Sequence, residues 1–392
     1  MHDHQSNPNI RLLDGAFYAT DAHRHFQWMR EHAPVYWDDA GVWGIAAYED
    51  VLAVSRDPQT FCNAHGMRPD APSLPYMINL DDPLHKQRRA LVNRGFTPRR
   101  VAELEPRIRA VCVDLIERAK LYPRFDFVKD IAAWLPLIVI GDMLGVAPEA
   151  HGHLLEWSDE MLGSSGSSDI EKIARAQAAF LDYRDYQSRV LAERREVAQN
   201  DLLSILAHAE IDGVRLDVEE VLMEALLILI GGDETTRHVI SGGMYELLRH
   251  PDQHRRLTED PTKIPAAVEE MLRWVTPIQN MARTATRDVT LRGQRITAGE
   301  KLLLLYPSAN RDAAVFRDPF TFDIERTPNE HLAFGYGAHF CLGSSLARLE
   351  LRVMFEELLR HLPNLELATD DPPLLRASNF ITGIESLPVE VR

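Results

Sequence analysis

Cysteine is scarce in this sequence: Cys62, Cys112 and Cys341 lie far apart among 392 residues. This odd, scattered set excludes a disulfide framework, and it contains no Cys-x-x-Cys pair, zinc spacing or Cys-x-x-Cys-His motif. Cys62 and Cys112 have apolar neighbours and are expected to be core residues. Such cysteine usage fits a reducing cytoplasm. Four histidines near the N-terminus are expected to be solvated rather than metal ligands: His2, His4, His23 and His25.

Positive charge is also in short supply, since 43 Lys and Arg face 59 Asp and Glu, a formal net charge of −16. Nucleic-acid binding needs clustered basic residues, so we expect no nucleic-acid partner. The longest uncharged apolar run, 131–141, contains Pro136 and is shorter than the roughly 20 residues of a spanning helix. The N-terminus is polar, unlike a signal peptide or anchor. We therefore expect a soluble, cytoplasmic protein without a membrane span.

Helical periodicity is what the sequence has in abundance. Five segments are expected to form helices: 98–120, 170–199, 218–250, 264–275 and 344–362. Short strand-like segments are 42–46, 288–291, 301–306 and 387–391. No internal repeat or linker divides the chain, and the Ser/Gly-rich segment 163–168 is expected to be a mobile loop. The pattern predicts a single domain over 1–392 that is mainly α with small β-sheets.

The segment 218–250 predicts a helix of ~50 Å, about the width of the domain. From 221 to 230 it is apolar on nearly every face except at Glu224, which indicates burial through the middle of the protein. Its centre, Gly-Gly-Asp-Glu-Thr-Thr at 231–236, departs from this pattern. Glycine within a helix costs about 1 kcal/mol relative to alanine, and buried acids need partners or water. A local conflict of this kind indicates that the helix makes room for a ligand.

Cys341 lies in a glycine-rich segment directly before the predicted helix 344–362. Glycines allow the backbone to approach a flat ligand, and a helix N-terminus favours a thiolate. Taken alone, the segment more often marks a buried structural cysteine in a glycine-rich loop. However, Phe334, Gly337, His339, Cys341 and Gly343 match the haem-binding signature of cytochrome P450s, Phe-x-x-Gly-x-(Arg or His)-x-Cys-x-Gly. The sequence resembles that family.

The resemblance extends over essentially the whole chain, with the motifs in the family's order. It implies the cytochrome P450 fold, a triangular helical domain with a long central helix over haem b. Cys341 is the implied ligand of the haem iron, where a thiolate promotes cleavage of the O–O bond. Phe334, Gly335 and Gly343 are implied haem contacts around that ligand.

Residues 231–236 resemble the family's (Ala or Gly)-Gly-x-(Asp or Glu)-Thr-(Thr or Ser) motif. The resemblance implies that Glu234 and Thr235 are a catalytic acid–alcohol pair. Thr235 would orient water or the distal oxygen, and Glu234 would relay protons inward from solvent. Thr235 alone is equally expected to donate back to the carbonyl of Gly231, and both roles can hold together.

Glu270 and Arg273 lie three residues apart, on the face of helix 264–275 opposite its apolar side chains. Such a pair, taken alone, is expected at the surface and is worth a few tenths of a kcal/mol. The family's Glu-x-x-Arg motif implies a structural role instead, in which the pair is joined by Arg326. Because burying these charges costs desolvation, the role would be to hold the scaffold in register.

His85 and Arg89, four residues apart, match a His-x-x-x-Arg motif of the family. Together with His339 and Arg283 they are implied to bind the two haem propionates, since Arg and His donors pair well with carboxylates. The alternative is a solvated basic helix on the face where the family meets an acidic electron-transfer partner. Three neighbours are expected to belong to it in part: Lys86, Arg88 and Arg94.

The reaction implied by the resemblance is R–H + O₂ + 2e⁻ + 2H⁺ → R–OH + H₂O. The chain has no flavin or iron–sulfur motif, so electrons are expected from a separate ferredoxin and ferredoxin reductase. The Glu234–Thr235 pair argues against a peroxide-driven relative, which generally lacks it. A haem-based ligand binder without turnover remains an alternative from a different class.

Segments 68–70, 227–238 and 378–384 resemble a bacterial subgroup that hydroxylates the terminal methyl of sterol side chains and of branched lipids. An apolar small-molecule substrate is therefore expected, and segment 163–168 matches the position of the family's substrate lid. A terpenoid or plain fatty acid remains open, because resemblance can mark ancestry. The expected pocket walls are apolar: Met77, Ile78, Leu227, Ile230, Gly231, Ile278 and Met281.

Overall fold

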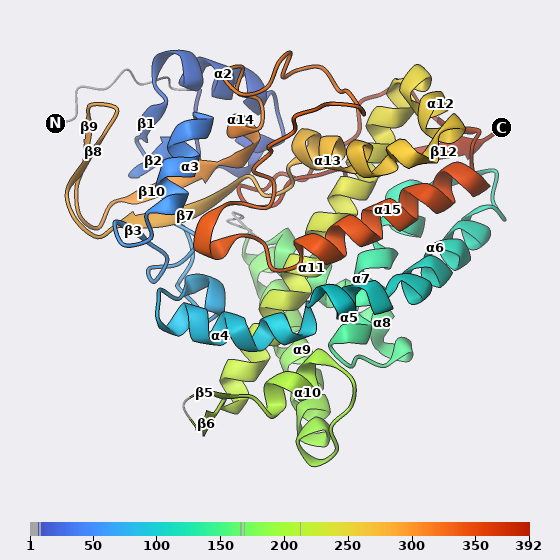
Figure 1. The fold of residues 1–392 in the computed structure, drawn as a ribbon, viewed down its shortest axis with the longest axis horizontal. Coiled ribbons are helices and arrows are strands. Elements are labelled where there is room, and N and C mark those ends of the chain that lie inside the picture. Colours follow the sequence, from blue (N-terminus) through green and yellow to red (C-terminus); the bar gives the residue numbers. More distant parts are fainter. Residues whose placement is uncertain (1–6, 8, 165–166, 168, 212) are drawn as a thin grey trace.

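Two long helices organise the molecule. The computed structural model describes residues 7, 9–164, 167, 169–211 and 213–392. Helix α11 (Val218–Arg249) runs through the middle, and α15 (Ser344–His361) packs against it (Figure 1). The predicted mainly helical fold with small sheets is confirmed.

Six further helices surround this central pair and bury the largest apolar cluster between them. Helix α7 is apolar almost all round because it packs against neighbours on several sides, α6, α8 and α11 among them. The six are α5 (Pro98–Glu103), α6 (Glu105–Ala119), α7 (Trp134–Met143), α8 (His151–Gly163), α9 (Ile170–Glu196) and α13 (Ile264–Val275).

Shorter helices complete the helical part. They are α1 (Gly15–Tyr18), α2 (Ala22–His32), α3 (Tyr48–Arg56), α4 (Leu84–Val92), α10 (Leu202–Ala207), α12 (Pro251–Glu259) and α14 (Tyr306–Ala309). Single turns of other helix types are η1 (Met77–Asn79), η2 (Asn93–Gly95), η3 (Val128–Ala132), η4 (Pro148–Ala150), η5 (Pro261–Lys263) and η6 (Gly337–His339).

The main sheet lies at the edge of the molecule that carries the N-terminal segments (Figure 1). Its order is β1 (Val35–Asp38), β2 (Val42–Ile45), β10 (Lys301–Leu305), β7 (Asn280–Ala285) and β3 (Phe61–Cys62). β10 runs parallel to β2 and antiparallel to β7. This pairing brings residues about 260 positions apart into one layer and carries Arg283 and Met281 on the strand β7.

Three small sheets lie outside the main one. β12 (Pro388–Val391) pairs with β11 (Leu365–Leu367) and β4 (Arg124–Asp126). The other two are the hairpins β5 (Glu210–Ile211) with β6 (Val214–Arg215), and β8 (Val289–Leu291) with β9 (Gln294–Ile296).

The prediction of one continuous helix over residues 98–120 is wrong. Segment 98–120 forms two helices, α5 and α6, which meet at Leu104. Pro106, in the first turn of α6, has no backbone N–H to donate to the carbonyl four residues earlier, so it starts a new helix. The other predicted long helices agree with the structure to within a few residues at their ends.

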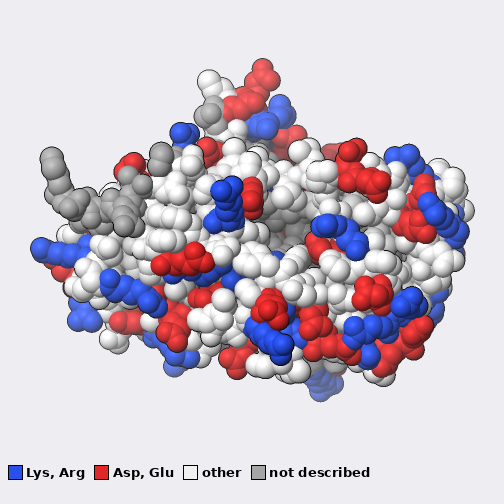
Figure 2. Space-filling view, turned by 90° about the horizontal axis from the view of Figure 1, so that it is seen from above, with Lys and Arg blue, Asp and Glu red and all other residues white. Residues whose placement is uncertain are grey.

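The described surface carries charges of both signs. Figure 2 shows basic and acidic side chains interspersed over one face. Within the described ranges, none of the helices combines the length and apolarity that crossing a membrane requires. The expected lid loop 163–168 contains residues 165, 166 and 168, which lie outside the described residues, as do His2 and His4.

Candidate active site

One stripe of α11 remains accessible although the helix is buried on most of its surface. Gly231 is exposed and Thr235 is partly exposed, while Asp233 and Glu234 are buried. A Cβ placed on Gly231 would meet no atom within 4 Å, whereas a Cβ on Gly232 would lie 2.9 Å from Ile140. Because α11 lies in the middle of the molecule, this exposure marks an internal space beside Gly231.

Thr235 faces the same space. Its hydroxyl donates to the carbonyl oxygen of Gly231 at 2.8 Å. The back-bond anticipated from the sequence is therefore present. Because the bond is solvent-accessible, the hydroxyl can exchange it for another partner.

Cys341 lies at the start of α15, and its backbone N–H donates to the carbonyl of Phe334 at 2.9 Å. Burial raises the pKa of the Cys341 thiol. Backbone N–H groups of Gly343 and Ser344 and the charge of Arg89 act in the opposite direction. The sulfur is thus surrounded by groups that stabilise a thiolate once a positive ligand is present.

The glycines on the two sides of Cys341 are required for different steric reasons. Gly337 has φ +78, and a Cβ there would collide with the carbonyl oxygen of Ser55. Gly343 has open space where its Cβ would stand. Gly337 is therefore needed because the backbone packs closely there, and Gly343 borders an unfilled space. Cys62 and Cys112 are buried, as predicted.

The four predicted propionate contacts come together from three separate parts of the chain. The rings of His85 and His339 lie 4.0 Å apart, centroid to centroid. Arg89 donates to the carbonyl of Phe340 at 2.5 Å, and buried Arg283 donates to that of Ala282 at 2.8 Å. We call His85, Arg89, Arg283 and His339 the basic cluster.

The two arginines of the basic cluster lack a negatively charged partner. Among the described residues, no carboxylate lies within ion-pair distance of Arg89 or Arg283. Burial, followed by the charges of Arg283, His85 and Arg89, lowers the pKa of His339 to about 2. Together with the thiol of Cys341 and the space beside Gly231, this donor set fits a flat, dianionic iron macrocycle such as haem.

Glu234 points away from that space into a buried ion-pair network. Its carboxylate lies 2.8 Å from Arg376, 3.0 Å from His238 and 3.3 Å from Arg237. Asp159 on α8 pairs with Arg237 at 2.8 Å. Burial acts to raise the pKa of Glu234, but the His238 hydrogen bond and the two guanidinium charges outweigh it and hold the pKa below its usual range. Glu234 is therefore ionised at neutral pH.

Two neighbouring buried acids behave in the opposite way. Ser158 donates to Asp233 at 2.7 Å, and burial together with the charge of Glu234 raises the pKa of Asp233. Burial and then Asp233 raise the pKa of Glu350, on α15, to about 8. At pH 7 the interior between α11 and α15 thus holds both protonated and ionised acids within a short distance.

The predicted pocket walls fall into two apolar groups that meet at Ile230. Met77, Ile78 and Leu227 belong to the large cluster around α11. Ile278 and Met281 pack with Ile230 in a second cluster, which adds residues that sequence reasoning missed. These are Met67, Leu162, Phe380 and Ile381. The likeness of segments 68–70 and 378–384 to the lipid-hydroxylating subgroup is the sequence signal that pointed near Met67, Phe380 and Ile381.

The Glu270 carboxylate is fully buried and holds two arginines. Arg273 donates to it twice at 2.7 Å, and Arg326 approaches both of its oxygens at 3.1–3.2 Å. Arg273 also donates to the carbonyls of Asn310 and Pro319, both at 2.9 Å. The three residues join α13 to the segment that leads to Cys341, so the contact lies in the interior rather than at the surface.

Two expectations about basic residues are wrong. Arg88 is buried rather than solvated, because it pairs with Glu220 at 2.5 Å and with Glu224 at 3.4 Å. Lys86 and Arg94 are exposed as expected. His23 is not solvated either: burial, followed by nearby arginines, lowers its pKa to about 3.

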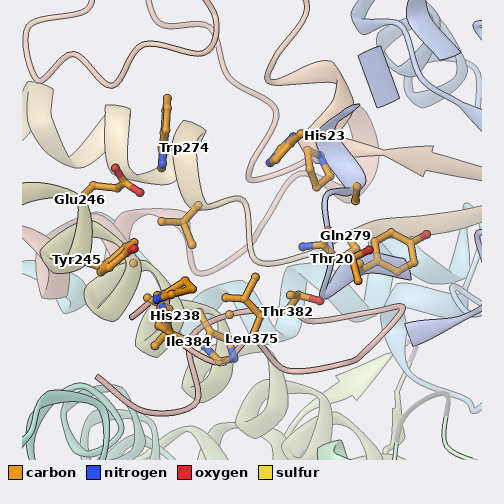
Figure 3. A pocket seen from close by; sticks show the side chains of 18 of the residues that line it. Thr20, His23, His238, Tyr245, Glu246, Trp274, Gln279, Leu375, Thr382 and Ile384 are labelled. Atoms are coloured by element: carbon orange, nitrogen blue, oxygen red, sulfur yellow. The ribbon is translucent and has the colours of Figure 1, made fainter. Parts of the chain in front are cut away.

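A cavity of about 330 Å³ lies on another side of α11 (Figure 3). His23, His238, Trp274 and Gln279 are among its lining residues. It contains neither Cys341 nor Thr235 in its wall. Because His238 contacts Glu234, the cavity is adjacent to the buried acid network and separate from the space beside Gly231.

Comparison with protein families identifies a match to the family model described as "Cytochrome P450" over residues 167–389. A steroid C26-monooxygenase of Mycobacterium tuberculosis is 49% identical over 385 residues, which cover 97% of each chain. A methyl-branched lipid omega-hydroxylase of Mycobacterium bovis is 38% identical, with 96% of this chain and 91% of that protein covered.

Solved structures agree with these relatives. Substrate-free CYP109E1 from Bacillus megaterium superimposes with a TM-score of 0.88 at 32% identity, covering 95% of this chain and 99% of that one. CYP109E1 in complex with testosterone gives a TM-score of 0.87 at 32% identity, covering 96% and 99%.

Proposed function

The chain belongs to the cytochrome P450 family and is a monooxygenase of that family, and from this premise we propose that it hydroxylates the terminal methyl group of a sterol side chain or a methyl-branched lipid. The likeness to a steroid C26-monooxygenase over nearly the whole of both chains carries the proposal. The apolar residues around Ile230 support it, because a lipid tail needs such walls.

Haem is the family's cofactor, and we assign haem b to the space beside Gly231. Cys341 is the proposed iron ligand, and the basic cluster would pair with the propionates. Phe334, Gly335 and Gly343 would border the ring. When bound, thiolate-ligated haem supplies the activation of dioxygen. We propose that residues 1–392 form a single haem-binding domain.

Two residues at the centre of α11 would control the delivery of protons. Thr235 can turn its hydroxyl from Gly231 toward a water in the accessible space. Glu234, ionised and one residue away, can accept a proton through His238 and pass it toward Thr235, while Arg376 holds its carboxylate in place. Glu270, Arg273 and Arg326 would keep the Cys341 segment in register without taking part in the chemistry.

Electrons would arrive from separate proteins, which we propose to be a ferredoxin and its reductase. Lys86 is exposed on α4, the helix that carries Arg89, and Arg94 is exposed in η2 directly after it. A docking site there would bring an acidic donor near Cys341. A cytoplasmic location fits this supply of electrons.

A spectral titration tests the substrate class. Purified ferric protein would be titrated with sterols, methyl-branched lipids, linear fatty acids and terpenes, and products would be identified by mass spectrometry with a ferredoxin system. We expect a substrate-type shift and a terminal alcohol with sterols or branched lipids. A shift with terpenes alone would contradict the proposal, and ligand binding without any oxygenated product would favour a binding protein.

A further inference from the structure

Glu224 is a buried acid that the proposed mechanism does not use. It lies on α11 within the apolar run 221–230, and its side chain is 0% exposed. Burying a carboxylate costs free energy that an apolar side chain of similar size would avoid. A specific partner is therefore needed to explain why the charge stands there.

The partners of Glu224 come from two other elements. Its Oε1 accepts the backbone N–H of Met77, in η1, at 2.9 Å. The Arg88 guanidinium of α4 lies 3.4 Å from the same oxygen and pairs with Glu220 at 2.5 Å. Oε2 has no hydrogen-bond partner among the described residues. One carboxylate thus joins α11, α4 and the start of η1.

The bond to Met77 satisfies a group that η1 cannot satisfy itself, because the first amides of a helical turn have no partner within it. The other side of η1 is held by asparagines. Asn79 accepts from Met67 at 2.8 Å and donates to Leu74 at 2.9 Å, and Asn63 donates to Ile78 at 3.0 Å. Glu224 supplies the contact that fixes this turn against α11.

Glu224 also lies on the same face of α11 as the accessible stripe. It precedes Gly231 by seven residues, nearly two full turns, so it lies about 10 Å farther along the same side of the helix. Leu227 is between them on that side. The Met77 amide contacts this part of α11 through Glu224, and Met77 and Ile78 belong to the same apolar cluster as Leu227. Their position therefore sets the shape of the pocket at its end remote from Thr235.

We propose that Glu224 is a specificity-determining positioning residue, which holds the Met77 amide and thereby sets where Met77 and Ile78 stand in the substrate pocket. The inference rests on the proposed function in that this pocket receives the lipid. A long substrate that reacts at one end is oriented by walls far from that end. A loose η1 would let carbons next to the terminal methyl reach the reacting position.

The charge of Glu224 makes this positioning sensitive to pH. Burial raises its pKa to about 7, and Arg88 and the Met77 amide act in the opposite direction. The charged and titratable groups around it are Arg88 of α4, Glu220 of α11 and the Tyr76 hydroxyl before η1. An ionised carboxylate is a stronger acceptor than a neutral one. Acidification through pH 7 should therefore loosen the hold on Met77.

Hydrogen exchange of the Met77 amide in the holoenzyme measures this hold directly, without substrate. In Glu224→Leu we expect its protection factor to fall at least tenfold, and the dissociation constant for the lipid to rise about tenfold. Hydroxylation should spread to neighbouring carbons while the carbon monoxide spectrum stays normal. In Glu224→Gln the amide oxygen still accepts from Met77, so protection should persist but lose its pH dependence.

Glu220→Gln is the matched control, since Glu220 pairs with the same Arg88 and has no contact with η1. It should keep the parent's protection and product pattern. Unchanged protection and products in Glu224→Leu would overturn the proposal, as would lost protection with an unchanged product pattern. Should the leucine variant not fold, parent protection that is independent of pH from 5.5 to 8 would overturn it.

The two proposals fail separately. If no sterol or branched lipid is hydroxylated, the proposed substrate class is wrong, and the product pattern is then measured on the lipid that the titration identifies. The exchange result at Met77 stands in either case.

Discussion

The Thr235 hydroxyl donates a hydrogen bond within its own helix, to the Gly231 carbonyl. That bond keeps the hydroxyl beside the accessible stripe without burying it. Catalysis needs the hydroxyl to orient a water or oxygen there, and binding of carbon monoxide does not. The two properties can therefore be separated by a single substitution.

Thr235→Ala should keep the thiolate-type carbon monoxide spectrum and substrate binding, while product per NADPH falls about tenfold and hydrogen peroxide rises. The measurement is the ratio of NADPH, peroxide and alcohol over one reaction. Thr258→Ala is a control, because Thr258 makes the same bond, to His254 at 3.0 Å, on the remote helix α12. Equal coupling in both variants would remove Thr235 from the mechanism.

Cys341 has a role that a hydroxyl cannot replace. Cys341→Ser is expected to abolish the absorption maximum near 450 nm of the reduced carbon monoxide complex, because serine is a poor donor of electron density to iron. The fold should persist, since the loop is held by the Cys341 backbone N–H to Phe334 and by Gly337 packing. Circular dichroism checks the fold, and Cys112→Ser controls for loss of an unrelated buried thiol.

At the scale of an element, α11 combines a closed and an open surface in adjacent residues. Gly232 packs against Ile140 of α7, while Gly231 faces open space. A glycine in a helix interior costs about 1 kcal/mol relative to alanine. At Gly232 the contact with Ile140 explains why glycine is needed. At Gly231 no protein atom requires glycine, so we attribute it to the space that the residue borders.

The two glycines give a matched pair of substitutions. Gly231→Ala should raise the free energy of unfolding by about 0.5–1 kcal/mol, because the methyl meets nothing and helix propensity improves. Gly232→Ala should lower it by about 1–3 kcal/mol through overpacking against Ile140. Urea unfolding of the haem-free proteins measures both, and a loss of stability in Gly231→Ala would mean that the space is not there.

Helices and their motifs could be predicted to the extent that they are local. The run around Gly231 and Thr235, and the segment before Cys341, carry their information within a few neighbours. Pro106 shows that even local prediction has a limit. The apolar periodicity continues across this proline, although one helix ends just before it and a new helix starts there. Spacing predicted that Glu270 and Arg273 share a face, but only the fold buries them.

Contacts between distant segments could not be predicted in the same way. Arg376 lies 142 residues from Glu234 and Met77 lies 147 from Glu224, and no spacing rule joins them. Arg88 looked solvated because its helix is basic, yet the acids that bury it come from α11. The pocket residues Leu162 and Phe380 are ordinary apolar side chains until the fold assembles them.

At the scale of the whole molecule, buried acids divide into two kinds. Glu234 and Glu269 have lowered pKa values, so their contribution to stability is present above the unfolded pKa and is lost as pH falls through the folded one. Glu350, with a pKa raised to about 8, contributes stability below its unfolded pKa near 4.3 and loses it as pH rises toward 8. Glu350 therefore favours stability on the acid side of neutrality, whereas His23 and His339, whose pKa values burial lowers, lose stability as pH falls below their unfolded pKa near 6.5.

Glu350→Gln tests this at one position. Between pH 5 and 8 the difference in free energy of unfolding between the parent and the variant should move by roughly 3 kcal/mol in the variant's favour, because only the parent has a carboxyl to ionise at this position. Urea midpoints across the range provide the measurement. A difference between parent and variant that stays constant from pH 5 to 8 would contradict the raised pKa.

The basic cluster has a consequence for how the protein is made. Arg89 and Arg283 have no carboxylate within ion-pair distance among the described residues, so a dianion would supply the negative charge that both guanidinium groups lack. Haem dimethyl ester, with the same ring and no charge, should bind at least tenfold more weakly in reconstitution. By mass action, a cofactor at one hundred times its dissociation constant adds about 2.7 kcal/mol to the folded state. The cell's supply of haem, rather than the rate of translation, should therefore set how much of this chain survives.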